Sequence, residues 1–183
     1  MNKTIIFIIA ISALIIIGIT IGKMTGNVTG NSNENIVLLK TNHGDIKIEL
    51  YEDMPITSGN FKKLVSEGFY NGVIFHRIID GFMIQGGDPT GTGTGGPGYA
   101  IEDEFTDHNQ NNRGTISMAN SGPNTGGSQF FINLANNNFL DSKHPVFGKV
   151  IERIDVIDKI AKVETGPGDK PIKDVVIEKA EII

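Results

Sequence analysis

Hydrophobic and polar positions divide the chain into three regions. Residues 5–22 are 18 consecutive uncharged and mostly apolar residues, flanked by Lys3 and Lys23. A helix of that length measures about 27 Å, close to the roughly 30 Å hydrocarbon core of a bilayer. It would have no polar face, whereas a helix packed against a soluble core has one. The pattern therefore predicts an N-terminal hydrophobic helix within residues 1–23 that spans a membrane.

A cleaved signal peptide is the alternative interpretation of this segment. Its apolar run is longer than the usual stretch of roughly 7 to 15 residues, and no A-x-A cleavage site follows it. The free amine and Lys3 precede the run and only Lys23 closely follows it, and this small difference favours an N-terminus inside the cell. We expect a single-pass anchor with the remaining chain outside the cytoplasm, and secretion after cleavage as the alternative.

The pattern changes twice after the apolar run. Residues 24–35 read MTGNVTGNSNEN, without apolar periodicity, and are expected to form a flexible linker. Residues 36–40 and 45–50 are short apolar or alternating runs around a Thr-Asn-His-Gly turn, which predicts a β-hairpin. We expect one folded domain over residues 36–183.

Two segments of this domain have helical periodicity. Pro55 suits the first position of a helix, so a helix is predicted from residue 55 to about residue 67, with Gly68 ending it. Isoleucines and Ala161 recur at helical spacing in residues 152–162, which predicts a second helix.

Strand-like alternation occupies much of the remaining domain. Residues 72–87 and 114–134 alternate apolar and polar positions between Gly, Asn and Asp, and the tail 171–183 is expected to end in a strand. Many short strands with two helices predict a mostly β fold. The pattern alone does not choose between a sandwich and a barrel.

Composition and charge narrow the possible partners. The chain has 183 residues and 39% hydrophobic content, enough for one domain with a sizeable core. Beyond Lys23 there are 14 basic and 21 acidic residues, which argues against binding nucleic acid or lying on anionic lipid. The chain has no cysteine, so it has no disulfide and no acylated cysteine anchor.

Three motifs suggest chemistry that the sequence does not support. Residues 93–98 fit G-x-G-x-x-G, but Pro97 and Gly98 prevent the helix that a dinucleotide pyrophosphate needs. Ser128 lacks the second glycine of a nucleophile elbow, because Phe130 stands in its place. The four histidines do not have the spacing of zinc ligands. We expect neither a metal nor a cofactor.

Arg77 is the strongest candidate for a functional side chain. It lies between Phe75 and Ile78 in an apolar strand, where an unpaired guanidinium is costly. An arbitrary arginine is more often a surface or ion-paired residue. Gln85 lies on the next apolar segment, and we expect it to orient Arg77.

Three blocks of sequence resemble one known family. They are residues 75–89 (FHRIIDGFMIQGGDP), 118–132 (MANSGPNTGGSQFFI) and 138–148 (NFLDSKHPVFG). Together they resemble the cyclophilin family of peptidyl-prolyl cis-trans isomerases, over about residues 36–183. The resemblance implies an eight-stranded antiparallel closed barrel with an α-helix capping each open end.

The resemblance also implies a site. It gives Arg77 and Gln85 catalytic roles. It assigns substrate-binding roles to Phe82, Met83, Gly93, Ala119, Asn120, Gln129, Phe131, Phe139, Leu140 and His144. The implied activity is rotation of X-Pro bonds in proline-containing polypeptide clients, which assists their folding, by a monomer without a cofactor. The alternative is a non-catalytic cyclophilin-like module that binds proline-containing segments.

One position departs from the family pattern. Phe139 stands where many cyclophilins have tryptophan, whose indole N–H donates a hydrogen bond that phenylalanine cannot make. We therefore expect weaker binding of cyclosporin-type cyclic peptides, with the isomerase activity largely kept.

Overall fold

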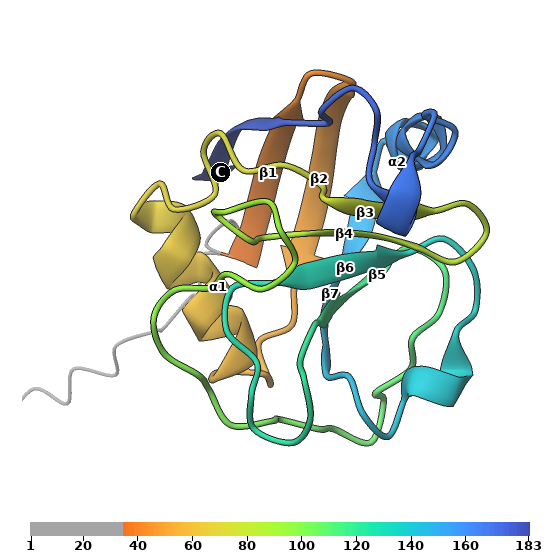
Figure 1. Cartoon of the computed structure of the whole chain (residues 1–183). Helices are drawn as coiled ribbons and strands as arrows, with labels where there is room; N and C mark the ends of the chain where they lie inside the picture. Colours follow the sequence, from red (N-terminus) through yellow and green to blue (C-terminus); the bar gives the residue numbers. More distant parts are fainter. Residues whose placement is uncertain (1–34) are drawn as a thin grey trace, which may run out of the picture. The chain divides into compact units, whose positions relative to one another are not determined.

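The computed structural model describes residues 35–183, and their fold is mostly β, as expected. The eight strands are β1 (Ile36–Thr41), β2 (Gly44–Leu50), β3 (Arg77–Ile79), β4 (Met83–Gly86), β5 (Thr115–Met118), β6 (Phe130–Asn133), β7 (Val146–Glu152) and β8 (Ile177–Ile182). They form one sheet in the order β3-β4-β6-β5-β7-β2-β1-β8, and each neighbouring pair is antiparallel. The sheet curls around its own core (Figure 1).

The expected closed barrel requires correction, because the sheet is curled but open. Its end strands β3 and β8 share no ladder. The segment before β3 meets the start of β8 through one bridge, Ile74 with Val176, and through short backbone hydrogen bonds such as Phe75 N to Val175 O at 2.9 Å. β3 begins only at Arg77, after this contact has ended, so the meeting of the sheet ends does not develop into a ladder.

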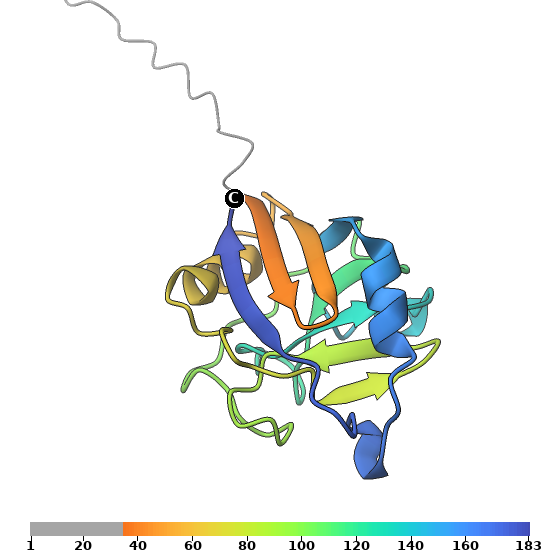
Figure 2. The same ribbon diagram turned by 90° about the horizontal axis from the view of Figure 1, so that it is seen from above.

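Two α-helices lie on opposite sides of the curled sheet, α1 (Thr57–Ser66) and α2 (Ile154–Ala161), as Figure 1 and Figure 2 show. Both were predicted, with slightly wider bounds. α1 buries Phe61, Leu64 and Val65. α2 buries Val156, Ile157, Ile160 and Ala161, whereas Ile154, the first helical residue, is 41% exposed.

The start of α1 depends on a residue far away in the sequence. The Glu104 carboxylate accepts hydrogen bonds from the backbone N–H groups of Ile56 at 3.1 Å and Thr57 at 2.9 Å. These N–H groups have no partner within a helix, and a carboxylate there also interacts favourably with the helix dipole. The loop that carries Glu104 thus fixes where the helix begins.

The two long strand-like segments each contain two strands. Residues 72–87 turn at Gly81, which has φ 71°, between β3 and β4. Residues 114–134 contain β5 and β6, joined by a loop. The sequence did not predict β7, which pairs with both β2 and β5. Gly148 makes the β2 contact possible, because a Cβ there would lie 2.6 Å from the carbonyl oxygen of Glu49.

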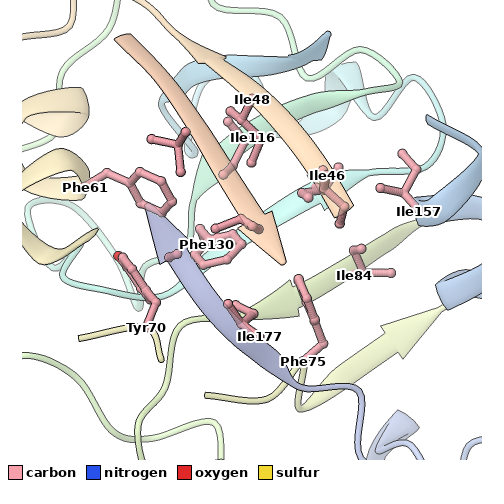
Figure 3. Packing of buried hydrophobic residues seen from close by; sticks show 14 of the residues in the cluster. Ile46, Ile48, Phe61, Tyr70, Phe75, Ile84, Ile116, Phe130, Ile157 and Ile177 are labelled. Carbon is pink, nitrogen blue, oxygen red and sulfur yellow. The ribbon is translucent and has the colours of Figure 1, made fainter. Parts of the chain in front are cut away.

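The core fills the inside of the curled sheet and continues under both helices (Figure 3). Phe61 of α1 packs on Tyr70, Phe130 and Phe147 with ring centroids 5.0, 5.4 and 5.2 Å away. Ile157 of α2 is fully buried at the other side. The sheet strands that carry the candidate site therefore rest on a well-packed interior.

No helix within residues 35–183 is long and apolar enough to cross a membrane. The hydrophobic helix expected within residues 1–23 lies outside the described residues. So does the expected linker over residues 24–35, apart from Asn35.

Candidate active site

Nine of the twelve residues predicted for the site line one cavity of about 270 Å³. They are Arg77, Phe82, Met83, Gln85, Ala119, Asn120, Phe131, Leu140 and His144. Gly93 and Gln129 line an adjoining cavity of about 470 Å³, which shares Gln85, Ala119 and Asn120 with the first. The remaining residue, Phe139, is 70% exposed and stacks on Phe82 with ring centroids 6.0 Å apart. The structure thus brings together residues from all three sequence blocks.

Strand pairing places three of these side chains in a row. Arg77 of β3 lies opposite Gln85 of β4, and Gln85 lies opposite Phe131 of β6. Residues directly opposite each other on antiparallel strands point to the same face of the sheet. A charged group, an amide and an aromatic ring therefore line up across one face.

Arg77 is only partly buried, and its environment differs from the one expected. Its side chain is 43% exposed, and its Nε lies 3.4 Å from the Asp169 carboxylate. Asp169 belongs to the short 3-10 helix η3 (Pro167–Asp169) and has φ 60°. The guanidinium is thus ion-paired at the rim of the cavity, and it is not isolated among apolar side chains.

Gln85 is adjacent to Arg77, but its amide is directed to another residue. Gln85 Nε2 donates to Gln129 Oε1 at 2.9 Å. Gln129 Nε2 in turn donates to the carbonyl oxygens of Gly93 at 3.0 Å and Gly95 at 2.9 Å. This chain of hydrogen bonds fixes the loop over residues 91–95 to the floor of the site.

An internal carboxylate shapes this glycine-rich loop. Asp88 is 1% exposed and accepts hydrogen bonds from the backbone N–H groups of Thr90 at 2.7 Å and Gly93 at 2.6 Å. Burial alone would raise the pKa of Asp88, but the hydrogen bonds from Thr90, Gly95 and Gly93 hold the pKa well below its usual value. The loop is therefore tightly turned around a charged centre.

Aromatic packing and one hydrogen bond hold His144 in the pocket wall. Its ring meets Phe131 edge to face, with centroids 5.4 Å apart. Its Nδ1 lies 3.0 Å from the Met118 carbonyl oxygen. A carbonyl only accepts, so Nδ1 carries the proton and Nε2 of the neutral ring is an acceptor.

A buried polar network behind the pocket was missed at the sequence level. Asn133, fully buried on β6, donates to Thr115 Oγ1 at 2.9 Å and accepts from Asn137 Nδ2 at 2.8 Å. Asn137 also donates to the Phe82 carbonyl oxygen at 2.9 Å, and Asn111 donates to Asp141. These residues fix the backbone of Phe82 and the 3-10 helix η2 (Asn138–Leu140), which carries Phe139 and Leu140.

Sequence pattern offered little to identify that network. Asn109 to Asn112 and Asn136 to Asn138 are Asn-rich runs, and such runs usually indicate solvent-exposed loops. Their burial becomes visible only when β5, β6 and η2 are assembled. In residues 35–183, no group of three or more His, Cys, Asp or Glu side chains could hold a metal ion.

Comparison with known proteins identifies the family. The protein-family model described as "Cyclophilin type peptidyl-prolyl cis-trans isomerase/CLD" matches residues 36–182. The chain belongs to the cyclophilin-type peptidyl-prolyl cis-trans isomerases. A peptidyl-prolyl cis-trans isomerase of Arabidopsis thaliana is 49% identical over 151 residues, which cover 80% of this chain and 94% of the relative. The human peptidyl-prolyl cis-trans isomerase-like 1 is 49% identical over 149 residues, which cover 79% of this chain and 90% of the relative.

A bacterial relative is longer, and a solved structure agrees in fold. A putative bifunctional phosphatase/peptidyl-prolyl cis-trans isomerase of Streptococcus pyogenes is 48% identical over 180 residues. The match covers 80% of this chain but only 38% of that longer relative. The crystal structure of a Cryptosporidium parvum cyclophilin is 38% identical and superposes with a TM-score of 0.79, covering 81% of this chain and 97% of that one. The same parasite protein has also been solved in the presence of the dipeptide Ala-Pro.

Proposed function

We propose that this cyclophilin isomerises X-Pro bonds of polypeptide clients in the 270 Å³ cavity, with Arg77 as the catalytic cation. The observation that carries the proposal is the row formed by Arg77, Gln85 and Phe131 across three strands. Because these residues lie on neighbouring strands, the row sets a guanidinium beside an apolar pocket. A proline ring could bind in the pocket while its amide meets the guanidinium.

The reaction needs no covalent chemistry. Rotation about the X-Pro bond faces a barrier of about 18 to 20 kcal/mol, because the amide has partial double-bond character. A rate of about 10³ per second requires that roughly 6 to 7 kcal/mol be removed. A cation that donates to the prolyl nitrogen stabilises the form in which that nitrogen is pyramidal and the bond is single. Preorganised charge in a water-poor site makes such a contribution large.

The apolar residues supply that site. Phe82, Met83, Phe131 and Leu140 are positioned to enclose the proline ring, and His144 completes the wall. We assign His144 a packing role, since its Nδ1 is engaged by Met118 and its ring by Phe131. A histidine acting as a general acid would make the activity change strongly near pH 6 to 7, around its usual pKa.

The remaining residues fit a role in holding the client backbone. The Asn120 side chain donates to the Lys143 carbonyl oxygen at 2.7 Å and accepts from Gly122 N at 3.3 Å. Because its side chain is used in this way, we propose that the backbone groups of Asn120 and its neighbour Ala119 meet the client. Gln85 and Gln129 support the same surface from below and fix the loop that carries Gly93.

We also propose a cellular setting. The apolar run 5–22 would anchor the chain in a membrane, with residues 24–35 as a linker and the isomerase domain outside the cytoplasm. Secretion after cleavage is the alternative. The clients would be proline-containing segments of proteins folding there, and the protein would act as a monomer that binds cyclosporin-type peptides only weakly and binds no nucleic acid.

The decisive experiment compares the whole chain with Arg77→Ala on a short X-Pro peptide. We expect the parent to accelerate isomerisation and the variant to lose at least ~100-fold in kcat/KM, about 2.7 kcal/mol. Arg113→Ala is the matched control, because Arg113 is also half-exposed and paired with an aspartate, Asp158, but lies outside the cavity. If a folded parent binds the peptide without accelerating isomerisation, the chain is a binding module.

A further inference from the structure

A third cavity, of about 430 Å³, opens beside the proposed proline pocket and shares Arg77 and Gln85 with it. Its walls come from the residue before β3, from the loop over residues 91–93 and from the η3 turn, which contributes Pro167 and Gly168 together with Lys170. Its volume lies within the range of about 300 to 1,000 Å³ that is typical of ligand sites. A client bound at Arg77 would therefore have a second recess next to its proline.

The charged side chains that line this cavity are both basic, and the Asp169 carboxylate next to it pairs with Arg77. The charged lining residues are Arg77 and Lys170. Residues 36–183 carry 14 basic and 20 acidic residues, so a cavity lined by two cations stands out from an acidic domain. Asp88, the nearest buried carboxylate of the loop, already accepts hydrogen bonds from Thr90 and Gly93.

Lys170 has donors to spare. Its Nζ makes one long contact, 3.4 Å to the Gly91 carbonyl oxygen, and within residues 35–183 it forms no ion pair. An ammonium group has three donors. Arg77 is different, because Asp169 engages its Nε while the terminal nitrogens stay available. Lys170 therefore contributes most of the unused positive charge.

The frame around Lys170 is fixed by backbone hydrogen bonds. Gly166 N donates to the Lys170 carbonyl oxygen at 2.8 Å, and Thr165 forms a bridge with Pro171. His76, another lining residue, is 6% exposed, and neither ring nitrogen has a partner within the described residues. Burial lowers the pKa of His76, so this wall is a neutral imidazole at neutral pH. The cavity is therefore a built recess with Lys170 in its lining.

We propose that this cavity is a subsite for the carboxylate of an Asp or Glu residue close to the target proline of the client. Lys170 pairs with the carboxylate, and Arg77 adds attraction from the side of the proline pocket. The inference rests on the proposed function and narrows its substrate class to X-Pro segments with a nearby acidic residue. Asp169 opposes the selection, because its charge partly neutralises Arg77.

The test uses the whole chain and matched peptides that differ only in Glu or Gln. The pair is placed in turn at each of the three positions before and after the proline, and kcat/KM is measured for each peptide. At one position we expect the Glu peptide to be preferred about fivefold, the size of an exposed ion pair. The preference should lie in KM and shrink as salt is added, because salt screens exposed charges.

Two variants should change the ratio of kcat/KM for the Glu peptide to kcat/KM for the Gln peptide in opposite directions. Lys170→Met removes the charge, keeps the aliphatic stem and brings the ratio to about one, whereas Asp169→Asn raises it by about twofold, since it removes the competing charge. Asparagine tolerates the left-handed backbone at this position. Lys173→Met is the control, because this exposed lysine lies outside the cavity, and it should leave the ratio unchanged.

Each outcome separates the subsite from the activity. If the Gln peptides are isomerised normally but the ratio is near one at every position, the subsite is overturned and the isomerase stands. A preference that survives Lys170→Met also overturns the subsite. If no peptide is isomerised by the folded chain, the proposed function and the subsite fail together.

Discussion

Arg77 faces the pocket with one of its five donors already engaged. Its Nε contacts Asp169 at 3.4 Å, and both side chains are nearly half-exposed. A single contact to Nε restrains the plane of the guanidinium and leaves the terminal N–H groups available. When a client covers the site and removes water, the attraction between these charges strengthens, because the local dielectric falls. At the scale of one residue, the proposed catalytic cation is therefore held in place from outside the pocket.

Phe139 is the second residue whose chemistry can be tested directly. Its ring is exposed and stacks on Phe82, so an indole fits at this position without disturbing the core. We expect Phe139→Trp to bind a cyclosporin-type peptide roughly fivefold more tightly, since it gains one hydrogen-bond donor worth about 1 kcal/mol. Inhibition of isomerase activity measures this. Unchanged inhibition by the variant would count against the role assigned to the indole.

We expect His76 to make the stability of the domain depend on pH. Burial lowers its folded-state pKa, and the neighbouring Arg77 and Lys170 also lower it, although Asp88 acts in the opposite direction. Below about pH 6.5 the unfolded state therefore binds more protons than the folded state, and the free energy of unfolding falls with falling pH. Urea denaturation between pH 8 and pH 5 should show this slope.

Two variants test the assignment of that slope to His76. His76→Phe should flatten the slope, because it removes the buried titrating group. His43→Gln should leave the slope as in the parent, since His43 lies in the turn between β1 and β2. A parent whose stability does not change over this pH range would refute the assignment.

At the scale of elements, η2 and the turn that carries Phe82 are held by side chains of Asn. Asn133 lies at the centre, joined to Thr115, Ser117 and Asn137 within the interior. We expect Asn133→Leu to lower the free energy of unfolding by about 2–3 kcal/mol, because the buried partners lose their hydrogen bonds. The same variant should raise KM, since the pocket wall loosens. Urea unfolding and steady-state kinetics give the two readouts.

Asn138→Ala is the matched control for that variant. Asn138 lies in η2 and is exposed, and its side chain bonds only to Asn112 and Asp141, which are half-buried. Its replacement should cost less than about 0.5 kcal/mol. Equal losses for both variants would mean that the buried network does not stabilise this region.

Local pattern determines how much of these elements the sequence can predict. The hairpin of β1 and β2 and the two helices were predicted correctly in kind, because alternation and helical spacing are local signals. β7 was not predicted, since its pairing with β2 depends on Gly148 passing close to Glu49. The contact between Glu104 and the start of α1 was not predicted either, because Glu104 lies 48 residues after Ile56 in the sequence.

The candidate site shows the same division. Resemblance to the family had assigned all nine residues that line one cavity to the site, because the sequence blocks that carry them are distinctive. It did not foresee that Asp169 pairs with Arg77 or that Gln85 donates to Gln129. Such contacts join segments of different strands and turns, and neither residue spacing nor hydropathy encodes them.

At the scale of the whole molecule, residues 35–183 supply the described core and the lining of the three adjoining cavities at the site. We therefore expect removal of residues 1–34 to leave kcat/KM within about twofold and the urea midpoint unchanged, since the described core keeps all its side chains. Cell fractionation tests the proposed anchor in the same pair of proteins. The whole chain should be found with membranes and the shortened chain in the soluble fraction.

Other outcomes of the fractionation would contradict the proposed membrane anchor. A whole chain that is processed to the shorter form and released would support a cleaved signal. A whole chain that stays soluble at full length would refute both interpretations of residues 5–22. Kinetics that change strongly on truncation would instead show that the first residues take part in the site.

The two ends of the domain leave from neighbouring strands. Val37 pairs with Ile182, and Ile183 N donates to the Ile36 carbonyl oxygen at 3.0 Å, so the C-terminus lies beside the start of β1 (Figure 2). Tension applied between these ends would pull β1 and β8 apart from one end of their ladder. The residue pairs would break one after another from that end. Such unzipping needs less force than shearing all pairs of a ladder at once. Under tension between its two ends, the domain is therefore expected to open first at the β1–β8 ladder.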